Sequence, residues 1–221
     1  MVLGLALVSC DDSEPKFSCN ETIDAWVKEH LSEIQKMTRS EWLESDARFS
    51  IPMYRAFTPN QRIDFWRKKF QELKTLSWTR DELAHILYLE NFFENHLDLF
   101  RTQRPSDQQL DELDAFLYKW KTVATEDLGW TNELAFVIVA SGQKVLDTKG
   151  TLQPMVKGKW IGNISGDKDN NKMESCNCHI DSFFTCGQQE ACENTPCDET
   201  SLGCGGFLVW SCDGRCEEPP H

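Results

Sequence analysis

Apolar residues recur at helical spacing through the first half of this chain. They fall every three or four positions, the period at which side chains share one face of an α-helix. Each stripe predicts an amphipathic helix whose apolar face lies in a core. The stripes are Ile23-Trp26-Val27-Leu31-Ile34, Ile63-Trp66-Phe70-Leu73, Leu83-Ile86-Leu87-Phe93-Leu97-Phe100 and Leu110-Leu113-Leu117-Trp120-Val123.

Helix start signals precede these stripes. A Ser or Thr followed three residues later by Glu or Gln is typical of a capping box, in which each side chain binds the other residue's backbone N–H. Thr58-Pro59 places a cap residue before a proline at the first helical position. Residues 46–58 and Arg104-Pro105 are predicted as loops. The expected boxes are Ser18 with Glu21, Thr38 with Glu41, Thr79 with Glu82, and Ser106 with Gln109.

The pattern predicts a mostly α fold. We expect a bundle of about five helices, packed as antiparallel neighbours because the connections are short. Residues 134–145 (LAFVIVASGQKV) suit either a buried strand or a helix. We favour the helix, because no partner strand is evident.

The cysteines divide the chain into two parts. A polar stretch at 164–175 predicts a linker between a helical domain, 18–163, and a cysteine-rich module, 176–221. A short segment with few apolar residues needs disulfides, metal or docking to stay folded, so the module is expected to be a small disulfide-rich irregular or β structure. Eight of the ten cysteines lie there: Cys176, Cys178, Cys186, Cys192, Cys197, Cys204, Cys212 and Cys216.

Disulfides and zinc are the two explanations of this cluster. Eight cysteines can pair in about 105 ways, and the sequence does not choose among them. Cys176-Asn177-Cys178-His179 looks like a metal-binding segment, but of the close Cys-x-x-Cys-like pairs only Cys212 and Cys216 have suitable spacing. We therefore favour four disulfides, with no metal and no cofactor.

The N-terminus resembles a bacterial lipoprotein signal. Residues 1–9 are apolar or small, and Leu7-Val8-Ser9-Cys10 resembles a lipobox, although no basic residue precedes it. The resemblance implies cleavage before Cys10 and a lipid on its thiol. The acidic segment 10–17 then resembles the surface-export tether of some Gram-negative lipoproteins. It predicts an outer-membrane or cell-surface protein of the bacterial envelope, held to the membrane by its lipid anchor only.

Charge and motifs exclude several functions. The net charge of -13 argues against nucleic acid and against electrostatic docking on anionic lipid. The chain has no phosphate loop, nucleophile elbow or dinucleotide fingerprint. Glu82 and His85 form a Glu-x-x-His pair, which occurs twice in di-iron bundles but only once here. No enzyme is predicted.

The cysteine module resembles a known family. It opens with Cys-x-Cys, continues to Gly203-Cys204-Gly205, and has Trp210 shortly before Cys212. This order is similar to that of the bacteriocin fulvocin C-related proteins, whose type peptide is disulfide-bonded. The resemblance covers about a fifth of the chain. It implies a bacteriocin-like module that is released from, or carried by, a longer precursor and acts on other bacterial cells.

Two hypotheses for function follow. The first is a bacteriocin-like exported lipoprotein in which the disulfide-bonded C-terminal module is the effector. The second is a surface-anchored binding protein without antibacterial activity, which engages a surface ligand through a contact patch of Phe207, Leu208, Val209 and Trp210. The same apolar run could instead form a miniature core, and exposure of Trp210 distinguishes the two. An enzyme in the helical domain is a third, weaker alternative.

Overall fold

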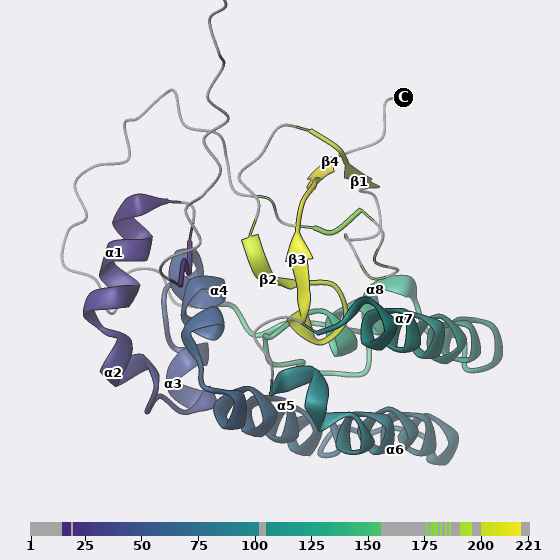
Figure 1. The fold of residues 1–221 in the computed structure, drawn as a ribbon. Helices are drawn as coiled ribbons and strands as arrows, with labels where there is room; N and C mark the ends of the chain where they lie inside the picture. The colour runs from purple at the N-terminus through teal and green to yellow at the C-terminus, as the bar shows by residue number, and fades with distance from the viewer. Residues whose placement is uncertain are drawn as a thin grey trace, which may run out of the picture.

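The protein is mostly helical, with a small strand-containing C-terminal part, as the sequence predicts (Figure 1). The helices are more numerous and shorter than the five expected. The computed structural model describes residues 15–18, 20–101, 105–155, 176, 178–180, 182, 184, 186, 191–195 and 200–217.

Four short helices form one end of the molecule (Figure 1). The predicted first helix breaks at His30, so its stripe is divided between two helices. Its start is also later than expected, because Asn20 and not Ser18 accepts the backbone N–H groups of Thr22 and Ile23. The helices are α1 (Glu21–Glu29), α2 (Leu31–Ile34), α3 (Arg39–Leu43) and α4 (Ala47–Ala56).

Helix α4 corrects the prediction of a loop at 46–58. Asp46 caps its N-terminus, and Phe49, Met53 and Ala56 are buried at helical spacing. Pro52 lies inside the helix, where it removes one backbone hydrogen bond. Burial of this apolar face outweighs the low helix propensity of proline, a tertiary effect that local signals do not carry.

Longer helices form the rest of the body. The capping boxes predicted at Thr38, Thr79 and Ser106 are all present, and Thr58 forms one with Gln61 ahead of Pro59. These elements are α5 (Pro59–Leu73), α6 (Arg80–Asn95), the 3₁₀ turn η1 (Leu97–Phe100), α7 (Asp107–Thr122), the π-helical turn η2 (Val123–Asp127) and α8 (Asn132–Val139).

Helix α8 settles the ambiguous segment 134–145 in favour of a helix for its first part only. The helix ends at Val139, and Val145 then forms an antiparallel bridge with Leu152. The β-branched run is therefore helical because it is buried: Val137, Ile138 and Val139 all lie in the core.

The C-terminal part contains two small antiparallel pairs. β1 (Ala191–Glu193) pairs with β4 (Arg215–Glu217), and β2 (Thr200–Cys204) pairs with β3 (Trp210–Cys212). The turn η3 (Gly206–Leu208) connects β2 to β3 and reaches down to the helices (Figure 1). Buried residues of the helices and of this connection form one hydrophobic core.

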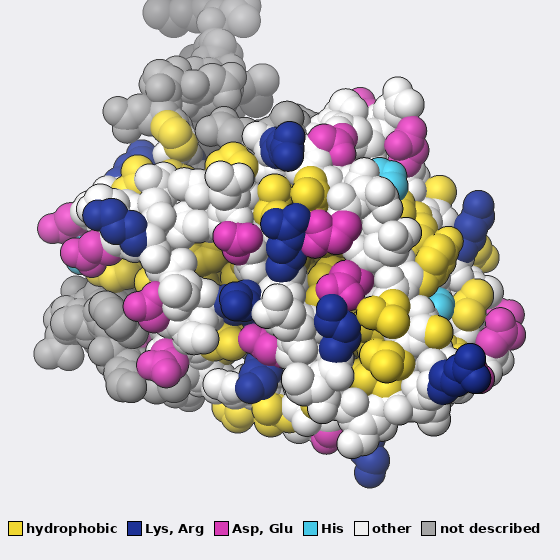
Figure 2. Space-filling view, turned by 90° about the horizontal axis from the view of Figure 1, so that it is seen from below, with side chains coloured by type: hydrophobic (Ala, Val, Ile, Leu, Met, Phe, Trp, Pro, Cys, Tyr) yellow, Lys and Arg dark blue, Asp and Glu magenta, His cyan; other side chains and the backbone are white. Residues whose placement is uncertain are grey.

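The acidic charge is not gathered on the face drawn in Figure 2. Lys and Arg alternate there with Asp and Glu, between small apolar areas. Among the described helices, none combines the length and apolar character needed to cross a membrane.

Candidate functional site

A cavity of about 350 Å³ opens between α1, α2, α3 and α4. Its apolar lining comes from Trp26, Ile34, Met37, Phe49 and Met53. Trp26 and Met37 are only partly buried, whereas the other three are buried in the core. The volume lies in the range of small-molecule sites, and the two methionines can adapt to different shapes because their side chains are flexible.

Two polar groups that line this cavity, His30 and Glu41, have partners within the protein. The His30 ring stacks on Trp26 with centroids 4.3 Å apart, and its Nδ1 lies 2.8 Å from the Trp26 carbonyl oxygen. Glu41 accepts the backbone N–H of Thr38 at 2.7 Å, a bond that lowers the pKa of the Glu41 carboxyl. Such groups orient the walls, and the cavity is suited to binding an apolar molecule more than to proton transfer.

A second cavity of about 320 Å³ lies between α7 and the C-terminal part. Asp107, Asp111 and Asp114 line it from one face of α7. Trp210 and His179 line it from the other side, and His179 Nδ1 is 3.0 Å from an Asp213 carboxylate oxygen.

Disulfides hold the C-terminal part together, as predicted. Cys176 is disulfide-bonded as well, to a residue outside the described ones. Several predicted features also lie outside the described residues. They are Cys197, Cys10, the signal-like segment 1–9 and the linker 164–175. The described bridges are Cys178–Cys192, Cys186–Cys216 and Cys204–Cys212.

The expected contact patch is wrong, because its residues belong to the core. Phe207, Leu208, Val209 and Trp210 are 0%, 4%, 3% and 7% exposed. The run is apolar because it packs against the helices, and only Val209 and Trp210 also border the second cavity.

Phe207 is the centre of this contact. Its ring meets Trp66 at 5.1 Å and Phe93 at 5.7 Å between centroids, with Phe70 and Phe100 slightly farther away. Aromatic pairs at these separations add to the free energy of area burial. The C-terminal part is therefore attached to the helical body by a buried aromatic side chain.

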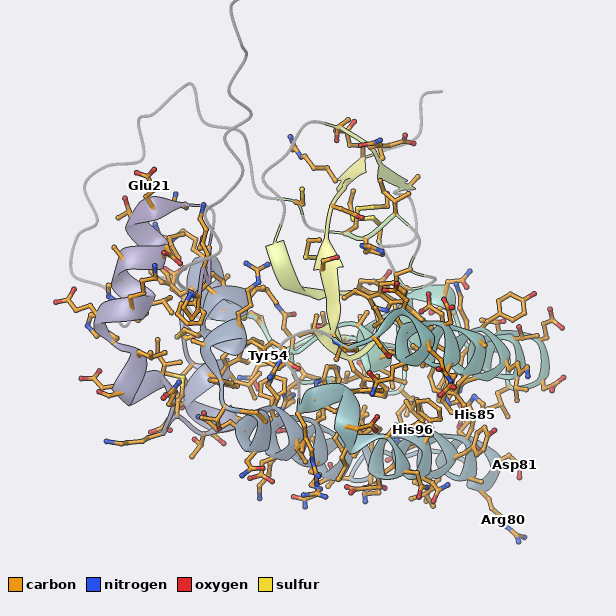
Figure 3. All side chains as sticks on the ribbon, in the orientation of Figure 1. Glu21, Tyr54, Arg80, Asp81, His85 and His96 are labelled. Atoms are coloured by element: carbon orange, nitrogen blue, oxygen red, sulfur yellow. A yellow bond between two sulfur atoms is a disulfide. The ribbon has the colours of Figure 1, made fainter. Side chains whose placement is uncertain are left out.

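Tyr54, labelled in Figure 3, lies on α4 and supports Phe207. Its hydroxyl donates to the Phe207 carbonyl oxygen at 3.2 Å and accepts from Trp66 Nε1 at 3.0 Å. Burial raises the pKa of Tyr54 to about 12, so the hydroxyl stays protonated and able to donate.

The backbone at this turn is unusual. Phe207 and Leu208 have φ values of 54° and 57°, in the left-handed region that non-glycine residues rarely adopt. Gly206 is needed for close approach, since a Cβ there would lie 2.2 Å from a Leu117 side-chain atom. Strain of this kind persists only where the surroundings fix the chain, here by burying Phe207.

His85 lies on α6, and His96 follows its last residue (Figure 3). His96 Nδ1 lies 2.7 Å from the Phe92 carbonyl oxygen at the end of the helix. The His85 ring stacks on Trp120 at 4.9 Å, and its Nε2 lies 2.9 Å from the Trp120 carbonyl oxygen. Burial lowers the pKa of His85, which favours the neutral ring. Glu82 completes the Thr79 capping box and accepts Trp130 Nε1 at 2.8 Å, so the Glu-x-x-His pair is used for packing.

Three cationic side chains that the sequence did not mark as buried, Arg39, Arg62 and Lys69, are buried, and two of them bind the segment after α8. Lys69 is 1% exposed and donates to the carbonyl oxygens of Val137, at 2.6 Å, and Ser141. Arg39 donates to the Gly142 carbonyl oxygen at 2.7 Å and binds Glu72. Burial lowers the pKa of Lys69 well below its ordinary value, and the Arg39 charge adds to this effect. Both cations secure the end of α8.

Comparison with known proteins gives no relative. No family model matches the chain. No curated protein and no solved structure matches it either. The similarity to the fulvocin C-related proteins therefore stays a prediction from the cysteine order.

Proposed function

We propose that this protein is an exported, lipid-anchored binding protein that takes a small apolar molecule into the cavity between α1 and α4. The observation that carries the proposal is that cavity, with its walls of Trp26, Ile34, Met37, Phe49 and Met53. Its polar lining groups His30 and Glu41 are engaged within the protein, so apolar contact would supply most of the affinity.

The disulfides support the export part of this proposal. Stable disulfides are typical of oxidising compartments, which a lipoprotein signal ending at Cys10 would reach. A lipid on Cys10 would place the cavity at a membrane surface without requiring a basic face, in agreement with the net charge of -13.

The ligand would be neutral or cationic at its polar end. The carboxylates of Glu33, Glu41 and Asp46 lie around the cavity, against one lysine, Lys36. Part of this negative charge is already balanced, because Asp46 pairs with Arg48 at 2.9 Å. An anionic group would therefore gain little there, whereas a flat ring or a short aliphatic chain fits the lining.

A fluorescence titration with 1-aminoanthracene, a small neutral aromatic dye, tests the proposal. The intact chain should bind the dye, and Met37→Trp should weaken binding about tenfold or more, which is 1.4 kcal/mol, by filling the cavity. Leu87→Trp is the matched control, because Leu87 is 44% exposed on α6. If Met37→Trp binds the dye as tightly as the wild type, the cavity is not the site.

The bacteriocin-like alternative rests on the cysteine order and on Gly203-Cys204-Gly205. Burial of Phe207 bears on how such an effector would work. Release of the tail would expose this ring and empty its place between Trp66 and Phe93. An effector tail would therefore act while attached to the body, which favours the binding protein over a released peptide.

A further inference from the structure

We propose that the reduced form of this protein binds one thiophilic divalent cation, of the Zn²⁺ class, through Cys178, Cys186, Cys192 and Cys216. In the oxidised form these residues make two neighbouring disulfides. This inference concerns a site other than the proposed ligand cavity. The cavity is lined by residues 26–53, and none of them belongs to the four-cysteine site.

The sulfur atoms are already gathered. The Sγ atoms of Cys178, Cys186 and Cys192 lie within 4.8 Å of one another, and Cys216 is bonded to Cys186. Zinc binds four thiolates at about 2.3 Å in a tetrahedron, which sets the sulfurs roughly 3.8 Å apart. Once the two disulfides are reduced, small side-chain rotations would bring the four sulfurs into one tetrahedral site.

The backbone keeps three of these cysteines together independently of the disulfides. Cys192 lies directly opposite Cys216 in the β1–β4 pair. Cys178 forms a bridge to Gly214, donating to its carbonyl oxygen at 3.2 Å and accepting the Asp213 N–H at 2.9 Å. Reduction cleaves only the S–S bonds and breaks none of these backbone bonds, which would therefore keep the thiols close.

Gly214 gives the cluster its room. A Cβ at this position would lie 2.7 Å from the Cys192 Sγ and 2.9 Å from the Glu193 carbonyl oxygen. Only glycine lets the Cys192 sulfur approach this turn so closely. Docking of Phe207 into the helical body holds the neighbouring β2–β3 connection through contacts that are not redox-sensitive.

The redox step is a reduction by a thiol or phosphine. Each of the two disulfides accepts two electrons and two protons. A thiol reductant leaves as its own disulfide, and a phosphine leaves as its oxide, with the oxygen and the two protons taken from water. Cation binding then displaces the four thiol protons. If the protein is exported as proposed, its cysteines pass through a reducing compartment first, where the cation would hold the four thiols until oxidation.

The third described bridge, Cys204–Cys212, provides the matched control. It joins β2 to β3 and contributes no sulfur to the cluster. The double variant Cys204→Ser/Cys212→Ser therefore removes as many thiols as Cys178→Ser/Cys192→Ser without touching the proposed site.

The test uses the full chain, reduced with a phosphine and titrated with Co²⁺ and Zn²⁺. The wild type and the 204/212 variant should bind one equivalent, with the visible absorption of tetrahedral thiolate-bound Co²⁺. The 178/192 variant should bind at least about tenfold more weakly. Circular dichroism checks that each reduced chain keeps its helices.

Alkylation of the Zn²⁺-loaded wild type needs no variant. Compared with the reduced, metal-free chain, Zn²⁺ should slow the alkylation of Cys178, Cys186, Cys192 and Cys216, as peptide mass spectrometry will show. It should leave the rates at Cys204 and Cys212, which are 4% and 1% exposed, unchanged. An equal Zn²⁺ effect at all six cysteines or at none, equal loss of binding in both double variants, or no stoichiometric binding would overturn the site. Failure of the metal site would leave dye binding in the helical cavity unchanged, so the two proposals fail separately.

Discussion

Phe207 concentrates much of the contact between tail and body in one side chain. Phe207→Ala should lower the free energy of unfolding by about 3–5 kcal/mol, because it removes a fully buried ring and leaves a cavity among Trp66, Phe70, Phe93 and Phe100. Denaturation in urea, followed by circular dichroism, measures the change. Leu146→Ala is the control, since Leu146 is 45% exposed and its loss should cost little. Equal effects of the two substitutions would contradict the role given to Phe207.

Lys69 makes stability depend on pH in a defined direction. Its folded-state pKa is depressed by burial, whereas the unfolded chain has the ordinary value of about 10.4. Between these two pKa values the unfolded chain binds more protons, so the contribution of Lys69 to stability rises with pH and levels off above about 10.4. Below the folded pKa that contribution is at its lowest.

Comparison with Lys69→Met isolates this contribution. The difference in unfolding free energy, wild type minus Lys69→Met, should increase from about pH 7 to pH 10. Lys68→Met, an exposed neighbour on the same helix, should give a flat difference. A difference for Lys69→Met that is flat or falls with pH would mean that the folded protein holds this ammonium group without penalty.

At the scale of elements, the local signals predicted helix starts well. Thr38, Thr79 and Ser106 cap their helices as expected, because the groups that satisfy the first N–H donors lie within three residues. The Ser18 prediction was wrong because Asn20, an equally good cap, accepts the Thr22 and Ile23 N–H groups, while Ser18 Oγ accepts the Asn20 N–H at 3.2 Å. Sequence determines such features when all partners are neighbours in the chain.

Elements that depend on distant partners were not predictable in this way. The helix around Pro52 exists because Phe49 and Met53 are buried by other helices. Helix α8 ends where Lys69 binds the Val137 carbonyl oxygen and Arg39 binds that of Gly142, just beyond the helix. Lys69 did carry a signal, because it falls on the stripe of Trp66, Phe70 and Leu73. A charged residue on an apolar stripe indicates a buried cation with backbone partners.

The candidate cavity was also beyond the sequence. Trp26 and Ile34 were correctly placed on an apolar face, but the space beside them arises from the way four short helices meet. Met37 and Met53 come from segments predicted as a connection and a loop. Apolar periodicity predicts which side chains face inward, and it says nothing of where packing leaves room.

At the scale of the whole molecule, two kinds of stabilisation meet at the β2–β3 connection. The helices are stabilised by burial, and the C-terminal part by disulfides. The Cys204–Cys212 bridge closes the connection that carries Phe207. The disulfide restricts the unfolded β2–β3 connection and so favours the folded state, in which Phe207 is buried. The buried Phe207 ring in turn holds the disulfide-bonded strands β2 and β3 on the helical body.

This coupling predicts the result of cutting the chain between body and tail. A site-specific protease sequence placed within 164–175 would be cut under native, non-reducing conditions, in a chain that also carries Cys176→Ser so that the Cys176 disulfide cannot link the two pieces. Because Phe207, Leu208 and Val209 are buried, the two pieces should co-elute in gel filtration after cleavage and should separate in urea. The same cleavage of the Phe207→Ala chain should give pieces that part at a lower urea concentration. A tail that leaves the cleaved wild-type body in native buffer would contradict the shared core, and it would favour a releasable effector over the anchored binding protein.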